Sequence, residues 1–264
     1  MPRVNVNVPS VQTSVIDEGR GRATLLIHGT SSSAEMGWGP VLPVLSAGRR
    51  CLAFDMLGAG QTQDQGQPVT LDVLVAQAQA VAGLAPGEQI DIIGYSLGAV
   101  VAAAAAAAMP ERVRRLVLLG GWVKADARMR IQFDLWASLS DTDKRQLARL
   151  LLINGLSAEF FAASAPETLQ AALERFSTLL SDGGGRQAAL DATIDIHALL
   201  PRIRARTLVI ALQQDRLVPP EHCRELAAGI AGARLESMNT GHLVFLEQPE
   251  ALIRMMMQFL DAPQ

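Results

Sequence analysis

Short strand-like runs, the later ones separated by helix-length segments, dominate the pattern of this chain. Eight runs have the length and composition of β-strands, and they cover residues 4–8, 14–17, 23–27, 50–55, 89–93, 113–119, 207–212 and 234–238. The later runs alternate with segments long enough for helices, which predicts a mostly parallel sheet covered on both faces. The early runs are joined by turns too short for a crossover, such as residues 18–21, and should be antiparallel at one edge. We therefore expect a mixed eight-stranded α/β sheet.

The alternation stops between residues 121 and 201. Apolar residues instead recur at helical spacing in residues 129–139, 143–152, 166–180 and 185–194. We expect a core formed by residues 1–121 and 201–264, with residues 122–200 inserted as a helical lid. The glycine run 183–185 inside this lid is interpreted as a helix break, with a mobile hinge as the alternative.

Composition narrows the classes of function. The 264 residues are 49% hydrophobic, which allows a substantial core, and the net charge of −3 without a basic run gives no reason to expect nucleic acid. No segment is apolar over the length of a membrane span, and the N-terminal residues alternate in polarity rather than forming a signal peptide. A cytoplasmic protein that acts on a small organic molecule is the expectation.

The most informative motif is the pentapeptide 94–98, Gly-Tyr-Ser-Leu-Gly, which follows a predicted strand and precedes the alanine-rich run 99–108. A Gly-x-Ser-x-Gly sequence between a strand and a helix is typical of a nucleophile elbow. The two glycines leave room for a strained turn that presents Ser96 above the sheet. The alternative is an ordinary turn in which Ser96 only caps the following helix.

A serine hydroxyl becomes a nucleophile when an imidazole accepts its proton and a carboxylate orients that imidazole. His242 and Asp215 each follow a predicted strand, and the carboxyl ends of parallel strands gather reactive groups at one edge of a sheet. His222 lies inside a predicted surface helix and is expected to be solvated. We therefore predict Ser96, Asp215 and His242 as the catalytic residues. Other acids lie in the predicted lid, where solvation is expected: Asp126, Asp134, Asp141, Asp143, Asp182, Asp191 and Asp195.

Charge that develops on a carbonyl oxygen needs donors already aimed at it. The N–H of Leu97, at the start of the helix, is one predicted donor. The second is the N–H of Thr30, with Gly29 as the alternative, because residues 28–30 follow a predicted strand. His28 is expected to brace this loop. The predicted substrate pocket is lined by His28, Gly29, Tyr95, Trp122, Phe133 and Trp136, although the lid aromatics are equally compatible with a plain lid core.

These residues together resemble the α/β-hydrolase superfamily, specifically its capped esterases, lactonases, cofactor-free haloperoxidases and carbon–carbon bond hydrolases. The resemblance covers nearly the whole chain and includes His28-Gly29, residues 55–62, residues 215–219 and Gly241-His242 besides the pentapeptide. It implies the α/β-hydrolase fold and the chain order serine, acid, histidine. Two departures stand out: the loop after Gly29 lacks a second glycine, and Thr62 occupies the place of a serine.

Serine at the elbow favours acyl chemistry. The expected activity is hydrolysis of a carboxylic ester, lactone or thioester of a small apolar substrate, free or bound to a carrier protein. Acyl transfer, cyclisation or elimination in secondary metabolism is the alternative, and a non-catalytic ligand-binding protein is a third. No cofactor or metal is expected, because Cys51 and Cys223 lack the spacing of metal ligands. Both a monomer and a homodimer are compatible with the sequence.

Overall fold

One mixed sheet forms the centre of the molecule. The computed structural model describes residues 1–8, 11–87 and 89–263. Its eight strands lie in the order β1-β2-β4-β3-β5-β6-β7-β8. From β4 onward in that order neighbouring strands are parallel, whereas β1 and β2 are antiparallel to their neighbours. The predicted sheet is confirmed, with these strands: β1 (Arg3–Val8), β2 (Val11–Gly19), β3 (Ala23–Ile27), β4 (Arg50–Phe54), β5 (Ile90–Tyr95), β6 (Val113–Leu119), β7 (Arg206–Leu212) and β8 (Arg234–Met238).

The short turn after β2 leads to β3, yet these two strands are not hydrogen-bonded to each other. β4 lies between them, antiparallel to β2 and parallel to β3. All five residues of β3 are buried, which suits an interior strand, whereas β2 ends in half-buried and exposed residues. The antiparallel edge is therefore built by β1 and β2, while β3 joins the parallel part of the sheet.

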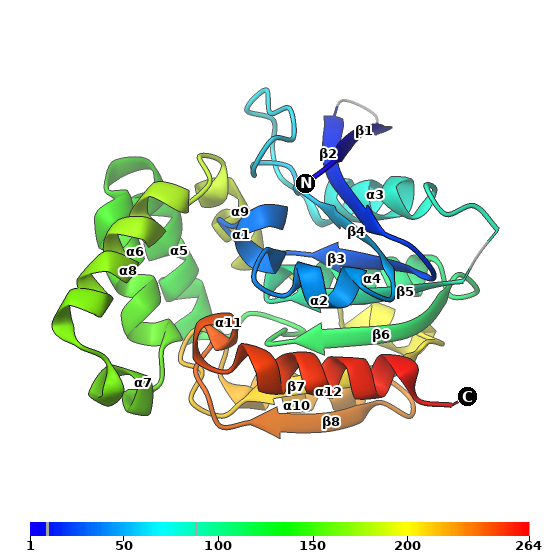
Figure 1. Ribbon diagram of the computed structural model, residues 1–264. Helices are drawn as coiled ribbons and strands as arrows, with labels where there is room; N and C mark the ends of the chain where they lie inside the picture. Colours follow the sequence, from blue (N-terminus) through cyan, green and yellow to red (C-terminus); the bar gives the residue numbers. More distant parts are fainter. Residues whose placement is uncertain (9–10, 88, 264) are drawn as a thin grey trace.

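Helices cover both faces of the sheet (Figure 1). One face packs against α1 (Ala34–Trp38), α2 (Leu42–Ser46) and α12 (Pro249–Asp261), which follows the short α11 (Val244–Glu247). The other face packs against α3 (Leu71–Ala82), α4 (Leu97–Ala108) and α10 (Pro220–Gly229). Every residue of α4 except Ala108 is buried, and its small side chains allow close approach to β5. Among the described residues, no helix combines the length and apolar character of a membrane span.

Helices α5–α9, which we call the helical insertion, connect β6 to β7 together with the 3₁₀ helix η1. In Figure 1, α5 to α8 lie together at the end of the sheet toward which β6 and β8 point. The sequence does not predict α7, because six residues are too few for a repeating apolar pattern. Of the glycine run 183–185, Gly183 is the N-cap of α9 and the other two glycines begin that helix, after the break that follows α8. The elements are α5 (Ala127–Thr142), α6 (Lys144–Gly155), α7 (Ala158–Ala163), α8 (Pro166–Leu179), α9 (Gly184–Asp191) and η1 (His197–Arg202).

Candidate active site

Ser96 occupies a strained turn between β5 and α4. Its backbone is left-handed, with φ 57° and ψ −123°, a conformation that costs a residue with a side chain about 1–3 kcal/mol. A Cβ at Gly94 would lie 2.1 Å from the carbonyl oxygen of Gly98, and a Cβ at Gly98 would lie 2.1 Å from that of Ile27. Both flanking positions therefore require glycine. Ser96 occupies the N-cap position of α4, but its side chain makes no capping hydrogen bond, so the alternative in which its hydroxyl accepts a backbone N–H of the helix is wrong.

Three side chains from three strand ends meet at this turn. The Nε2 atom of His242 lies 3.1 Å from Ser96 Oγ, and its Nδ1 atom lies 2.5 Å from Asp215 Oδ2. The other carboxylate oxygen of Asp215 accepts the N–H groups of Leu217 and Val218, each at 2.8 Å. These two bonds hold the carboxylate so that Oδ2 faces the imidazole. With Nδ1–H donating to Asp215, Nε2 is the atom free to accept the serine proton.

Tyr95 and Gly120 both lie against His242. The Tyr95 hydroxyl donates to the carbonyl oxygen of His242 at 2.9 Å, and the two rings pack with centroids 5.0 Å apart. Burial raises the pKa of Tyr95 well above its usual value, so the phenol remains a donor. At Gly120, where φ is +58°, a Cβ would lie 3.4 Å from His242 Cε1. These contacts restrict the ring to the position that reaches Ser96.

The loop after β3 passes close to the serine. A Cβ at Gly29 would lie 3.1 Å from the Cβ of Ser96. Within the described part of the chain, the N–H groups of Leu97, Gly29 and Thr30 have no acceptor. Unpaired donors beside a nucleophile are suited to receive a developing negative charge.

His28 braces this loop through main-chain hydrogen bonds. Its Nδ1 lies 2.7 Å from the carbonyl oxygen of Gly29, and its Nε2 lies 3.0 Å from the N–H of Met56. Because an N–H must donate and a carbonyl must accept, Nδ1 carries the proton and Nε2 accepts. Complete burial lowers the pKa of His28, which keeps the ring neutral.

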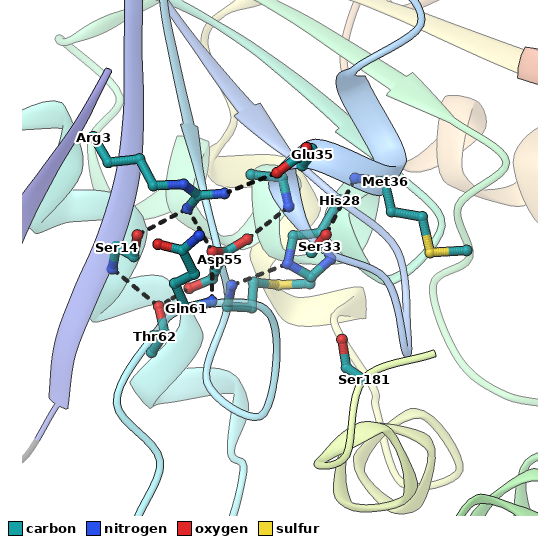
Figure 2. A network of polar contacts seen from close by, with 12 residues as sticks. Arg3, Ser14, His28, Ser33, Glu35, Met36, Asp55, Gln61, Thr62 and Ser181 are labelled. Carbon is teal, nitrogen blue, oxygen red and sulfur yellow. Dashed lines mark hydrogen bonds and ion pairs between the residues drawn. The ribbon is translucent and has the colours of Figure 1, made fainter. Parts of the chain in front are cut away.

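The turn that contains Met56 is itself fixed by a buried carboxylate, shown in Figure 2. The Asp55 carboxylate accepts Arg3 Nη1 from β1 at 2.7 Å and the N–H of Gln61 at 2.9 Å. The Thr62 hydroxyl donates to the carbonyl oxygen of Asp55 at 2.5 Å and accepts the N–H of Ser14 at 3.0 Å. Only a hydroxyl at position 62 is needed for these bonds, so threonine serves in place of serine.

Aromatic side chains of the helical insertion form a buried row that reaches the same loop. Ring centroids of Trp122 and Phe133 are 5.4 Å apart, and those of Phe133 and Trp136 are 6.3 Å apart. The Trp136 indole N–H donates to Ser31 Oγ at 2.9 Å. The row therefore connects the strand end of β6 to residue 31. Contact of these rings with a substrate stays a prediction.

Two polar residues of α9 contact this loop, although the sequence predicts a site role for neither. Gln187 Oε1 accepts the N–H of Ser31 at 2.8 Å, and Asp191 Oδ2 lies 2.6 Å from Thr30 Oγ1. Both side chains are fully buried, so the expectation that Asp191 is solvated is wrong. A carboxylate on a short helix looks like a surface residue in the sequence, and only the contact with a loop 161 positions away buries it. The other six lid acids are exposed as expected.

His222 also departs from expectation. Its side chain is buried rather than solvated, and its Nε2 lies 3.2 Å from Asp126 Oδ2. Asp126 caps α5 by accepting the N–H of Met129 at 2.7 Å, which places the carboxylate next to α10. The contact between α10 and the start of α5 therefore covers a histidine that an isolated helix would expose.

The fold and this geometry define an α/β hydrolase. Residues 24–249 match the model of the alpha/beta hydrolase fold family, and the chain belongs to that family. It is 35% identical over 257 residues, 97% of both chains, to pyrrolizixenacetamide deacetylase from Xenorhabdus hominickii. It is 28% identical to 2-hydroxy-6-oxo-2,4-heptadienoate hydrolase from Pseudomonas putida, over 96% of this chain and 94% of that one.

The solved structure of the enol-lactonase from Burkholderia xenovorans LB400 has the same fold, with a TM-score of 0.86 at 22% identity, covering 99% of this chain and 100% of the other. A hydrolase from Pseudomonas aeruginosa PA01 matches with a TM-score of 0.85 at 25% identity, covering 98% of both chains. Because its relatives are hydrolases and esterases, the chain is an enzyme of the hydrolase type.

Proposed function

We propose that this enzyme hydrolyses a carboxylic ester, lactone or thioester of a small apolar substrate through an acyl-enzyme on Ser96. The observation that carries the proposal is the hydrogen-bonded chain from Ser96 Oγ through the imidazole of His242 to the carboxylate of Asp215. A base in contact with a serine hydroxyl, oriented by a buried carboxylate, provides what attack on an acyl carbon requires.

In the first half of the reaction, Ser96 Oγ bonds to the acyl carbon while its proton moves to His242 Nε2. The N–H groups of Leu97 and Thr30 donate to the carbonyl oxygen as it becomes negative. The intermediate collapses, the bond to the alcohol or thiol breaks, and the leaving group takes the proton from His242. A water molecule then attacks the acyl-enzyme with His242 as base, which releases the acid and restores Ser96.

Amide hydrolysis is a second candidate, supported by the 35% identity to a deacetylase along almost the whole chain. The same steps apply with an amine as leaving group. An amine is a poorer leaving group than a thiol, so proton transfer from His242 must accompany its departure. A matched series with one acyl group on an alcohol, a thiol and an amine would rank the candidates by kcat/KM.

Replacing the nucleophile tests the mechanism directly. We expect a fluorophosphonate to add one adduct to the wild type, observed by intact-mass analysis, and none to Ser96→Ala or His242→Ala. Ser96→Ala should lower kcat by about 10³-fold or more while thermal unfolding remains close to that of the wild type. A folded Ser96→Ala variant that retains most of the activity would overturn the covalent mechanism. If, in addition, His242→Ala were inactive, His242 would be acting as a base on its own.

A further inference from the structure

The loop that carries the proposed oxyanion donor is held by the helical insertion. Ser31, which follows Thr30, has a φ of +58°, in the left-handed region that favours glycine. Its N–H donates to Gln187 Oε1 at 2.8 Å, its Oγ accepts the Trp136 N–H at 2.9 Å, and its carbonyl oxygen accepts the N–H of Ser181 at 2.9 Å. All three partners belong to the segment between β6 and β7. The strained conformation therefore depends on the insertion as well as on the core.

Thr30 has one partner of its own in the insertion. Its Oγ1 lies 2.6 Å from Asp191 Oδ2 at the end of α9, and the carboxyl group is fully buried. The second oxygen, Oδ1, has no partner among the described residues. A buried polar group destabilises the folded state unless hydrogen bonds compensate for its lost hydration. Among the described residues, the side chain that hydrogen-bonds this carboxyl group is that of Thr30.

Among the residues that the structure describes, none with a positive charge pairs with the carboxyl group of Asp191. Burial raises its pKa to about 8, and the Thr30 hydroxyl opposes this only in part. The group is thus mostly neutral at pH 7, and its contact with Thr30 is a short bond between two uncharged groups. Such a bond fixes the side-chain torsion of Thr30 without placing a negative charge beside the site where an oxyanion would form.

We propose that Asp191 is a positioning residue for acyl transfer to Ser96, holding Thr30 so that its N–H points at the carbonyl oxygen. The inference rests on the proposed function and adds that the helical insertion completes the oxyanion hole. With Thr30 Oγ1 bound to Asp191 and the Ser31 N–H bound to Gln187, the peptide units around Thr30 have little freedom to rotate. Backbone donors act only from the correct position, and a shift of about 1 Å can cost about 100-fold in rate.

Arg186, on the same helix, provides a matched control. Its Nη1 donates to the carbonyl oxygen of Gln67 at 2.5 Å, and its guanidinium forms an ion pair with Asp64. These bonds attach α9 to the segment before α3, away from the loop after β3. Arg186→Met therefore loosens the attachment of α9 while leaving the bond between Asp191 and Thr30 in place.

The experiment uses the full chain with two pairs of variants and this control. Thr30→Val and Asp191→Leu remove the bond while keeping the number and branching of side-chain heavy atoms, whereas Thr30→Ser and Asp191→Asn preserve it. For each variant, kcat and KM are measured on one ester, together with the rate constant of fluorophosphonate labelling. We expect Thr30→Val and Asp191→Leu to lower kcat and the labelling rate about 10–100-fold with KM within about threefold. Thr30→Ser and Asp191→Asn should recover most of the kcat and labelling rate that Thr30→Val and Asp191→Leu lose, whereas Arg186→Met, outside the loop, should stay within about threefold of the wild type.

The losses of kcat in Thr30→Val and Asp191→Leu should not be additive in the double variant, because both substitutions remove the same contact. A folded Thr30→Val variant with unchanged kcat overturns the inference. An equal loss in Arg186→Met also overturns it, because general loosening of α9 would then explain the effect. If Asp191→Leu does not fold, the comparison of Thr30→Val with Thr30→Ser decides. Failure of the wild type to label removes the proposed function itself, whereas labelling of the wild type with unchanged variants removes this inference alone.

Discussion

At Gly98 the chain has no room for a side chain. An added Cβ would lie 2.1 Å from the carbonyl oxygen of Ile27 and 2.5 Å from that of His28, and neither backbone atom can move without shifting β3. Gly98→Ala should therefore lower the free energy of unfolding by about 3 kcal/mol, measured by urea denaturation. Gly48→Ala is the control, because a Cβ there meets nothing within 4 Å. Equal losses in the two variants would contradict the steric explanation.

The buried carboxyl group of Asp191 predicts how stability depends on pH. Its pKa rises from 3.8 to about 8 on folding, so the folded state binds more protons between these pH values. The contribution of the protonated Asp191 carboxyl group to stability is fully present below pH 4 and is lost as pH rises toward 8. Asp191→Asn does not titrate, so its free energy of unfolding relative to the wild type should increase with pH, by at most about 1.4 kcal/mol per unit. Urea titrations at several pH values test this, and a pH-independent difference would contradict it.

The beginning of β5 carries a buried carboxylate that links several elements. Asp91 accepts Arg49 Nη1 at 2.8 Å and Arg114 Nε at 2.8 Å, so the residue before β4 and a residue of β6 share one anion. Asp91→Leu leaves both guanidinium groups without their shared carboxylate and should lower the free energy of unfolding by about 3–5 kcal/mol. The ion pair of Arg49 with Asp261 is the comparison, because the side chain of Asp261 is 59% exposed. Asp261→Ala should lower the free energy of unfolding by about 1 kcal/mol or less, and thermal unfolding measures both variants.

Elements with a repeating pattern could be predicted from the sequence, and elements fixed by distant contacts could not. Residues 23–27 are apolar except for Thr24, and β3 has these bounds. β2 extends beyond the predicted residues 14–17 to Val11 and Gly19, because β1 and β4 pair with its polar ends. Strand ends also locate Ser96, Asp215 and His242. No local pattern marks Gln187 or Asp191, since their burial depends on a loop more than 150 positions away.

On the scale of the whole molecule, burial differs sharply between the core and the helical insertion. Every residue of α4 except Ala108 is buried, whereas α8 buries only Leu173 and α7 buries none of its residues. Helices with few buried contacts open at a smaller free-energy cost. We expect amide hydrogen exchange, followed by mass spectrometry, to be faster in α7 and α8 than in α4. Protection of α8 equal to that of α4 would show that the insertion opens only with the whole fold.

Such opening bears on how a substrate reaches Ser96. Ser96 is 6% exposed and His242 4% exposed, so a substrate must displace surrounding side chains to contact them. The helical insertion lies beside the carboxyl ends of the strands, where these residues meet (Figure 1). Helices α7 and α8 are therefore the part of the insertion that we expect to yield, while α9 stays attached to the loop after β3.

The attachment of α9 has a consequence for recombining parts of related enzymes. Residues 30–32 form hydrogen bonds with residues 136, 181, 187 and 191 through both side chains and main chain, so the two segments are complementary to each other. A chimaera that receives a foreign insertion but keeps its own loop would lose those hydrogen bonds beside Ser96. Grafting an insertion from a related enzyme therefore requires exchanging both segments together.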